Sequence, residues 1–346
     1  MIVIRNVKKE SKKMNEPIAI KNPGRDGIGF AVDLGTTTIA MTGILLCDGS
    51  SLGECSQVNV QTQLGSDVMM RIMHAIRGKE KELQQMVVQQ IESMAENILR
   101  KAGRKNEQNI IFTVVGNTTM SHLFLGRDVK GLAGAPFVGD YAGNYQCKGK
   151  EVGMNLFSNA SILVLSNIQA HVGGDALAVI GALALGKEKK KRQLAIDLGT
   201  NAEIILNDQG KLSVCSTAAG PAFEGKGVDC GMTAKAGAIN GVRIAVQNGN
   251  MILEVLESDH PKGICGTGLD LLAQLRKSKV LREDGYLISK EEALAEGISE
   301  QIAKQLVIKN QENIFILTRQ GQKEIYLSQS DIRNLQLAKG AIQAGV

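Results

Sequence analysis

The sequence predicts an α/β fold built from two related sheet-and-helix units, and three observations support this prediction. First, the segments FAVDLGTTTIAMTGILL (30–46) and LAIDLGTNAEIILNDQGKL (194–212) both run from an apolar stretch through Asp-Leu-Gly-Thr into a second apolar stretch. Second, apolar residues make up 43% of the chain and aromatic residues only 3%, so the cores must consist mainly of aliphatic side chains. Third, 346 residues leave room for at least two domains.

The first unit is expected over 28–186, after a charged leader (1–27). Within it we expect strands over 28–34, 38–46, 56–61, 109–116 and 161–167, and helices over 66–77, 79–102 and 174–186, with a short helix from Thr118. The helix over 79–102 rests on apolar residues spaced three and four apart, namely Leu83, Met86, Val87, Ile91, Met94, Ala95, Ile98 and Leu99. This mixture of adjacent strands and intervening helices predicts hairpins followed by βα crossovers.

The second unit is expected over 193–346, after a basic linker KEKKKR (187–192). It repeats the strand-turn-strand opening, with strands near 194–198, 202–207, 211–215, 242–246, 251–255 and 313–319. A glycine turn leads into a helix within 263–279, and a helix over 328–346 is capped by Ser330 or Ser328. The chain stops within this helix, which is unusual for a helix of the core type.

Composition excludes several classes of protein. The net charge is only +5 and the basic runs lack interleaved aromatic residues, which argues against a nucleic-acid interface. No apolar run reaches the ~20 residues of a membrane helix, and ALAVIGALALG (176–186) fits a buried helix better. The N-terminus is too charged for a signal peptide, so we expect a cytoplasmic protein without membrane contact.

The six cysteines show no spacing of a metal or cluster site. They form no C-x-x-C pair and no C-x₄-C-x₂-C run. We therefore expect reduced, buried thiols and no iron-sulfur cluster on this chain.

Each Asp-Leu-Gly-Thr turn has the chemistry of a phosphate site. The strand delivers a carboxylate at its end, the glycine lets the backbone approach a ligand, and the following N–H groups and hydroxyls suit an anion. Asp33 and Asp197 would repel a phosphate, so their natural ligand is Mg²⁺, held through water. Two such turns facing one another would hold one polyphosphate.

These turns resemble the first and second phosphate motifs of the actin, sugar-kinase and heat-shock (ASKHA) superfamily, whose duplicated ribonuclease-H-like domains form an interdomain nucleotide cleft. Further strings narrow the resemblance to the ATPase region of the reductive activators of corrinoid proteins, over 28–346. They are VGNTTMSHLFLG (115–126), APF (135–137), VGGDALA (172–178), AAGPAFEGKGVDCGM (218–232), ICGTGLDLLAQL (264–275) and DIRNLQLAKGAIQAG (331–345).

The resemblance implies an ATPase that uses ATP and Mg²⁺ to drive reduction of Co(II) corrinoid proteins in methyltransferase systems. Asp33 and Asp197 would be the metal-side carboxylates, with Asp197 also catalytic, and the phosphate cradle would be Gly35, Thr36, Thr37, Gly199, Thr200 and Asn201. The other cofactor-binding candidates are Glu203, Gly220, Glu224, Gly225, Gly266, Thr267 and Gly268. Asp175 would position the attacking water, with a helix cap as the alternative.

Two departures from the family pattern matter. Members usually carry an iron-sulfur domain, and no cysteine precedes Cys47, so a separate iron-sulfur donor is expected. The pattern also continues past the final helix into a segment that packs on adenine, so the resemblance implies that the second unit is incomplete at its C-terminus. The alternatives are an activator of a radical 2-hydroxyacyl-CoA dehydratase and a non-catalytic ASKHA scaffold that binds partners. A homodimer stays open.

Overall fold

The computed structural model describes residues 27–104, 107, 109–187, 189–321 and 323–346, and these pack as two compact units. Unit 1 reaches Asp197 and also takes in Glu203–Ser216, whereas unit 2 consists of Leu198–Ala202 and Thr217–Val346. The expected leader, except Gly27, and Glu188 of the expected linker lie outside the described residues.

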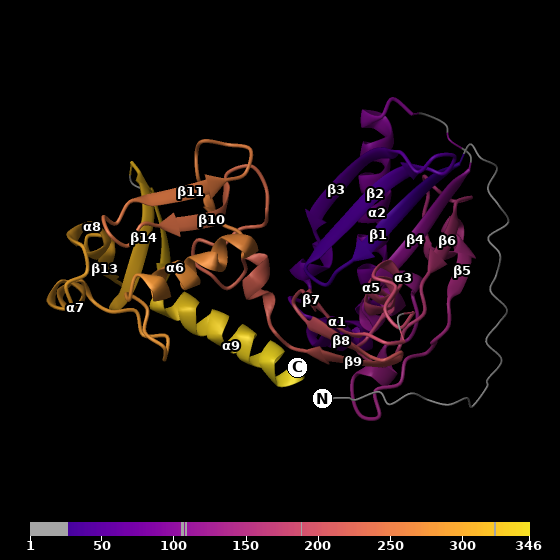
Figure 1. Cartoon of the computed structure of the whole chain (residues 1–346). Helices are drawn as coiled ribbons and strands as arrows, with labels where there is room; N and C mark the ends of the chain where they lie inside the picture. The colour runs from indigo at the N-terminus through magenta and orange to yellow at the C-terminus, as the bar shows by residue number, and fades with distance from the viewer. Residues whose placement is uncertain (1–26, 105–106, 108, 188, 322) are drawn as a thin grey trace. The chain divides into compact units, whose positions relative to one another are not determined.

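Unit 1 is built on a six-stranded mixed sheet in the order β3-β2-β1-β4-β6-β5 (Figure 1). Its strands are β1 (Ile28–Leu34), β2 (Thr38–Leu45), β3 (Ser51–Val58), β4 (Ile110–Gly116), β5 (Tyr145–Lys148) and β6 (Ser161–Val164). β1, β2 and β3 form an antiparallel meander, β4 pairs parallel with both β1 and β6, and β5 is an antiparallel edge strand. The predicted hairpins and crossovers are therefore confirmed.

Two of the predicted strands need correction. The strand expected over 56–61 is β3, which begins at Ser51 and ends at Val58, because Asn59 leaves the sheet to bond the β1–β2 turn. The strand expected over 161–167 ends at Val164.

Helices cover the sheet of unit 1. They are α1 (Val68–His74), α2 (Glu80–Lys101), α3 (Thr118–Leu125), α4 (Gly149–Val152) and α5 (Gly174–Ala182), and a π-helical turn (Ala75–Lys79) joins α1 to α2. The predicted apolar stripe of α2 is buried except for Met86, which is half-buried. It packs into a core with β1, β4 and α3, in which the rings of Phe30 and Phe112 stack at 5.0 Å.

A three-stranded sheet, β7-β8-β9, repeats the hairpin pattern with β7 (Arg192–Leu198), β8 (Ala202–Asp208) and β9 (Lys211–Thr217). It shares a small core with the α5 region, made of Val172, Ala176, Leu185, Ala195, Ile205 and Val214. This packing explains why most of the second hairpin belongs to unit 1, although the second sequence block begins at 193. The boundary at 187–192 stays a prediction.

The helix α5 is shorter and less buried than expected. The sequence predicts a helix over 174–186, but α5 ends at Ala182 and the chain turns where Ala184 has a φ of 50°. Leu183, directly after the helix, is 54% exposed. Within this apolar run only Ala176 and Leu185 are buried, so the expectation of a buried helix is wrong for most of it.

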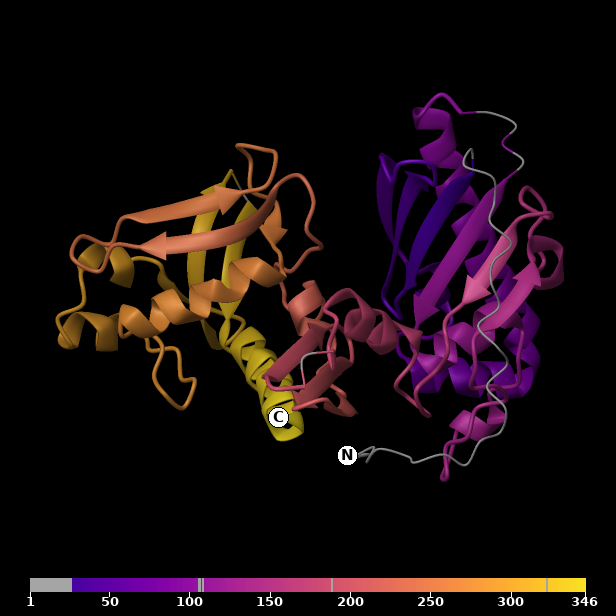
Figure 2. The same cartoon turned by 45° about the vertical axis from the view of Figure 1, so that its right-hand side comes forward.

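Unit 2 contains two small sheets and a long C-terminal helix, drawn in orange and yellow in Figure 2. One sheet, β11-β10-β12, consists of β10 (Ala238–Ile244), β11 (Met251–Val255) and β12 (Gly263–Ile264), and the other consists of β13 (Leu306–Lys309), β14 (Glu312–Gln320) and β15 (Lys323–Ser328). The helices are α6 (Leu271–Lys277), α7 (Lys290–Ala295), α8 (Glu300–Ala303) and α9 (Gln329–Gly345).

The start of α9 distinguishes the two predicted caps. The Ser328 hydroxyl accepts a hydrogen bond from the Asp331 backbone N–H, and the Asp331 carboxylate accepts one from the Ser328 N–H. This reciprocal pair is a capping box. Ser328, not Ser330, is the N-cap.

The burial of the cysteines and the length of the helices test two further expectations from the sequence. None of the six cysteines, all of which the structure describes, forms a disulfide, but only Cys215 and Cys265 are buried, so the expectation of buried thiols is wrong for the other four. In the part of the chain that the structure describes, no helix combines the length and the apolar character that crossing a membrane requires.

Candidate functional site

The first Asp-Leu-Gly-Thr turn joins β1 to β2, and the carbonyl oxygens of Gly35, Thr36 and Thr37 all accept hydrogen bonds. The side chain of Asn59 donates to the Gly35 oxygen over 2.9 Å, and its backbone N–H donates to the Thr37 oxygen over 2.9 Å. The Thr36 oxygen accepts a hydrogen bond from the Arg71 guanidinium. These three carbonyl groups, whose negative ends would repel a phosphate, are thereby hydrogen-bonded to donors of unit 1.

Gly35 is required by the close folding of this turn. A Cβ at this position would overlap the Thr38 carbonyl oxygen, a backbone atom that cannot move away freely. The glycine predicted to let the backbone approach a ligand therefore also lets the turn close on itself.

A third contact joins the turn to α3. Asn117 is the N-cap of this helix, and its Oδ1 accepts from the Met120 N–H over 3.0 Å. Its Nδ2 donates to the Thr36 hydroxyl over 2.9 Å. Both ends of the Asn117 amide are thus used, one for the helix and one for the turn.

Asp175 lies in the first turn of α5, whose N-cap is Gly173. A Cβ at Gly173 would overlap the backbone of Gly116 and Asn117, so this glycine allows α5 to begin directly against the end of β4. The Asp175 carboxylate accepts from the Ala176 N–H over 2.7 Å. It therefore supports the helix N-terminus without being the N-cap residue, and its role in positioning water stays a prediction.

Four carboxylates of unit 1 influence one another. Burial raises the pKa of Asp175 to about 6, and the negative charges of Asp33 and Asp197 add to the shift. Burial raises the pKa of Glu203 to about 8, with Asp175 and Asp197 again adding to it. Burial also raises the pKa of Asp197. The charges of both turn aspartates therefore act on Asp175, and those of Asp175 and Asp197 act on Glu203.

Glu203 is the most enclosed of the four. It is 6% exposed, and the Ser216 hydroxyl donates to its Oε1 over 2.9 Å. This hydrogen bond favours the ionised form, but burial outweighs it. A protonated Glu203 reduces the negative charge that the cluster must hold at neutral pH.

These carboxylates fit a hydrated cation better than a directly ligated one. Among the described residues, no group of three or more His, Cys, Asp and Glu side chains is arranged to hold a metal ion. Mg²⁺ gives up its water shell reluctantly and is often bound through water. A divalent cation near Asp33, Asp175 and Asp197 would offset their mutual repulsion, so the donor set fits Mg²⁺.

The second turn, Gly199–Asn201, is organised by the GPAFEG segment within unit 2. The Thr200 hydroxyl donates to Glu224 Oε1 over 2.8 Å, and the Gly220 N–H donates to the Thr200 oxygen over 2.8 Å. The other carboxylate oxygen of Glu224 is buried and has no partner among the described residues. A cation or a bound water would satisfy this oxygen.

The GICGTG segment contains the glycine turn that the sequence predicts. It is a 3-10 turn (Gly266–Asp270) that leads into the short α6. Side chains at Gly266 and Gly268 would overlap the carbonyl oxygens of Phe223 and Ile239. Close packing of backbones is therefore the role that the structure gives these two glycines.

Gly225 and Thr267, two further nucleotide-binding candidates, also lie in this part of unit 2. Gly225 has a φ of 75°, a conformation that favours glycine, and the Thr267 hydroxyl lies 3.3 Å from the Cys265 sulfur. Contact of these residues with a nucleotide stays a prediction.

Sequence reasoning missed Asn59, Arg71 and Asn117, the three residues that hold the first turn. Asn117 stands within the GNTTM string, which offered a signal. Arg71 and Asn59 offered none, because a lone arginine in VMMRIMH and an asparagine within the strand expected over 56–61 are usually exposed.

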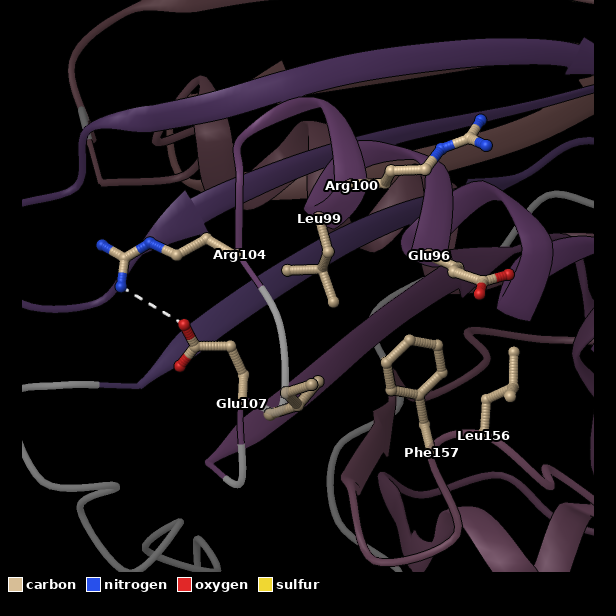
Figure 3. Close-up of a pocket in the computed structure, with 8 residues that line it drawn as sticks. Glu96, Leu99, Arg100, Arg104, Glu107, Leu156 and Phe157 are labelled. Atoms are coloured by element: carbon tan, nitrogen blue, oxygen red, sulfur yellow. Dashed lines mark hydrogen bonds and ion pairs between the residues drawn. The ribbon is translucent and has the colours of Figure 1, made fainter.

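A pocket of about 400 Å³ lies elsewhere in unit 1 (Figure 3). It is lined by Leu99, Ile110, Leu156 and Phe157, with an ion pair of 3.2 Å between Arg104 and Glu107. Ile110 begins β4, whereas Gly116 and the first turn lie at the other end of that strand, roughly 20 Å away. None of the predicted site residues lines this pocket.

The mixed sheet of unit 1, the turn at the end of β1 and the repeated hairpin at β7 and β8 define an ASKHA-type α/β fold. Two family models match the chain: the RACo middle region over residues 28–188, and the C-terminal domain of RACo, the ASKHA domain, over residues 191–346. The chain belongs to the RACo family, and the resemblance found in the sequence is confirmed.

Curated and solved relatives agree with this assignment. The corrinoid activation enzyme RamQ of Eubacterium limosum is 32% identical over 92% of this chain and 53% of its own length. The [Co(II) methylated amine-specific corrinoid protein] reductase of Methanosarcina barkeri is 38% identical over 26% of this chain and 17% of its own length.

A solved structure, "Reductive activator for corrinoid,iron-sulfur protein", superposes with a TM-score of 0.83 at 29% identity. The superposition covers 93% of this chain and 51% of the chain of that activator. The chain thus spans about half the length of RamQ and of this activator.

Proposed function

We propose that this chain is the Mg²⁺- and ATP-dependent ATPase module of a corrinoid activator. It drives reduction of a Co(II) corrinoid protein of a methyltransferase system, and a separate iron-sulfur protein donates the electrons. The observation that carries the proposal is the coupling of Asp33, Asp175, Asp197 and Glu203 in the unit that holds the Gly35–Thr37 turn. The names of the relatives support the corrinoid protein as partner.

Different residues of the chain serve the metal, the phosphates and the attacking water in this proposal. Asp33 and Asp197 bind the waters of Mg²⁺, and the turns 35–37 and 199–201 bind phosphate oxygens. Mg²⁺, when bound, neutralises the charge that builds up on the phosphates. Asp175, with a pKa near 6, is suited to orient the attacking water and to accept its proton.

ATP binding favours reduction only if it changes the equilibrium between two states of the complex with the corrinoid protein. Nucleotide must therefore bind more tightly to the state in which the corrinoid accepts the electron. Each ~1.4 kcal/mol of this preference shifts the equilibrium about tenfold.

Calorimetry with a non-hydrolysable ATP analogue tests the binding step. We expect the wild-type chain to bind the analogue in a Mg²⁺-dependent manner, and Asp197→Asn to weaken this binding at least tenfold with little change in melting temperature. Asp208→Asn is the matched control, because Asp208 is an exposed carboxylate of the same hairpin, ion-paired to Arg192 at 2.8 Å. Equal affinities in the wild type and Asp197→Asn would contradict the proposal.

Turnover assays distinguish the alternatives. A corrinoid activator hydrolyses ATP faster when a Co(II) corrinoid protein is present, whereas a dehydratase activator does not respond to that protein. A scaffold binds partners without hydrolysing ATP.

A further inference from the structure

A buried arginine lies directly behind the first turn. Arg71 belongs to α1, and its exposure is 0%. By residue volume it is the largest of the fully buried side chains among the described residues. An arginine is seldom buried to this extent without an acidic partner, because removing a charge from water is costly.

The guanidinium makes four contacts, all with uncharged groups. Nε donates to the Gly65 oxygen over 3.0 Å, and Nη1 donates to Gln61 Oε1 over 3.2 Å. Nη1 also lies 3.0 Å from the Met120 sulfur, and Nη2 donates to the Thr36 oxygen in the turn.

Within the described part of the chain, no carboxylate lies within ion-pair distance of Arg71. Asp67 is the acidic residue whose charge acts on it, and the Asp67 side chain is engaged as the N-cap of α1, where it accepts from the Met70 N–H over 2.9 Å. Burial lowers the pKa of Arg71 to about 10, so the group keeps its positive charge at neutral pH.

Asn59 provides an internal comparison. It holds the carbonyl oxygens of Gly35 and Thr37 on either side of Thr36, and it does so with neutral donors. A third neutral donor would have been enough to fix the Thr36 peptide. The fold instead uses a charged group, which it must bury without a counter-ion.

We propose that Arg71 is a positioning residue for a bound polyphosphate and that its counter-charge is the ligand. The guanidinium fixes the Thr36 carbonyl on the protein side of the turn. Its positive charge, one peptide away from the predicted phosphate cradle, stabilises negative charge bound there, since water screens little inside a buried layer. This inference rests on the proposed function and adds to it a residue that does not touch the nucleotide.

Calorimetry with Mg·ATP analogue, Mg·tripolyphosphate and adenosine tests the inference on the full chain. We expect Arg71→Gln to weaken binding of both polyphosphates at least tenfold and to leave the affinity for adenosine unchanged. Arg71→Lys retains the charge, so it should recover most of the lost affinity. Loss of the bond to Thr36 alone could also weaken phosphate binding selectively, so the recovery by Arg71→Lys and a pair of variants that leaves Arg71 in place test the charge itself.

A second pair of variants leaves Arg71 in place. Met120→Glu puts a carboxylate next to Nη1, and Met120→Gln is its neutral match of the same size and shape. We expect Met120→Gln to bind Mg·tripolyphosphate within about twofold of the wild type, and Met120→Glu to bind it at least tenfold more weakly, because the counter-ion is then internal. Melting temperatures establish that each variant is folded.

The outcomes separate this inference from the proposed function. A wild-type chain that binds no Mg·ATP analogue overturns both. A wild-type chain that binds it while the folded Arg71 and Met120 variants bind with equal affinity overturns the role of Arg71 alone.

Discussion

The Asn117 amide donates to the Thr36 hydroxyl over 2.9 Å, which links residues 81 positions apart. Thr36 is also bonded through its carbonyl oxygen to Arg71, and Arg71 contacts Met120 in the first turn of α3. The first turn, α1 and the start of α3 therefore form one polar layer at the end of β1 and β4. Substitutions in this layer should therefore change the stability of the turn.

A double-mutant cycle of Thr36→Val and Asn117→Ala measures this link. We expect Asn117→Ala to lower the free energy of unfolding by about 1 kcal/mol through the lost cap, and by more through the lost bond to Thr36. The coupling energy between the two sites should be about 1 kcal/mol, as urea unfolding of the four proteins would measure. Additivity within ~0.3 kcal/mol would argue against the link.

The two Asp-Leu-Gly-Thr glycines should differ in their tolerance of a side chain. A Cβ at Gly35 overlaps the Thr38 oxygen, whereas a Cβ at Gly199 lies 3.2 Å from the Asn201 oxygen, its nearest neighbour. We expect Gly35→Ala to lower stability by about 2 kcal/mol or more and Gly199→Ala by less than about 1 kcal/mol. Gly143→Ala, with open space around its Cβ, is the control for thermal unfolding. A larger loss in Gly199→Ala than in Gly35→Ala would show that this packing argument fails.

The sequence was most informative where local signals and packing agree. The hairpin β1–β2 and the helix α2 follow the predicted bounds within one residue, because apolar periodicity, a turn glycine and a helix stop at Gly103 all point the same way. The capping box of α9 is equally local, since Ser328 and Asp331 are three residues apart. The same holds for the position of Asp33 at the end of a strand.

What the sequence could not predict depends on distant contacts. The end of β3 is set by the bond from Asn59 to Gly35, 24 residues earlier. The burial of Arg71 depends on Thr36 and Met120, 35 and 49 residues away. The division into units depends on the packing of β7–β9 with the α5 region, which no local pattern encodes.

The buried acid Glu203 should make stability depend on pH. Its folded-state pKa of about 8 lies above the ~4.3 of an unfolded glutamate, so between these values the folded chain holds a proton that the unfolded chain has lost. The free energy of unfolding therefore falls as pH rises from ~4.5 to ~8. Asp175, with a pKa of about 6, acts in the same direction at lower pH.

Melting temperatures across this range test the prediction. We expect the wild type to lose stability from pH ~6 to pH ~8.5, and Glu203→Gln to lose much less, because glutamine does not titrate. Added Mg²⁺ should reduce the wild-type loss by compensating the negative charge. Parallel curves for the two proteins would exclude Glu203 as the titrating group.

The last prediction concerns the source of electrons. None of the six cysteines forms a disulfide, and the described residues contain no group of three or more His, Cys, Asp and Glu side chains placed for a metal. We expect the chain purified without oxygen to be colourless, and reduction of a Co(II) corrinoid protein to require an added low-potential donor. Reduction should be poor without nucleotide and better with Mg·ATP, because binding energy shifts the corrinoid complex toward the reducible state. Asp197→Asn should lose the effect of ATP while keeping the basal rate, as absorbance spectra of the corrinoid would report. A stoichiometric iron-sulfur absorbance of the purified chain, or equal reduction with and without nucleotide, would contradict the proposal that this chain is an ATPase module served by a separate donor.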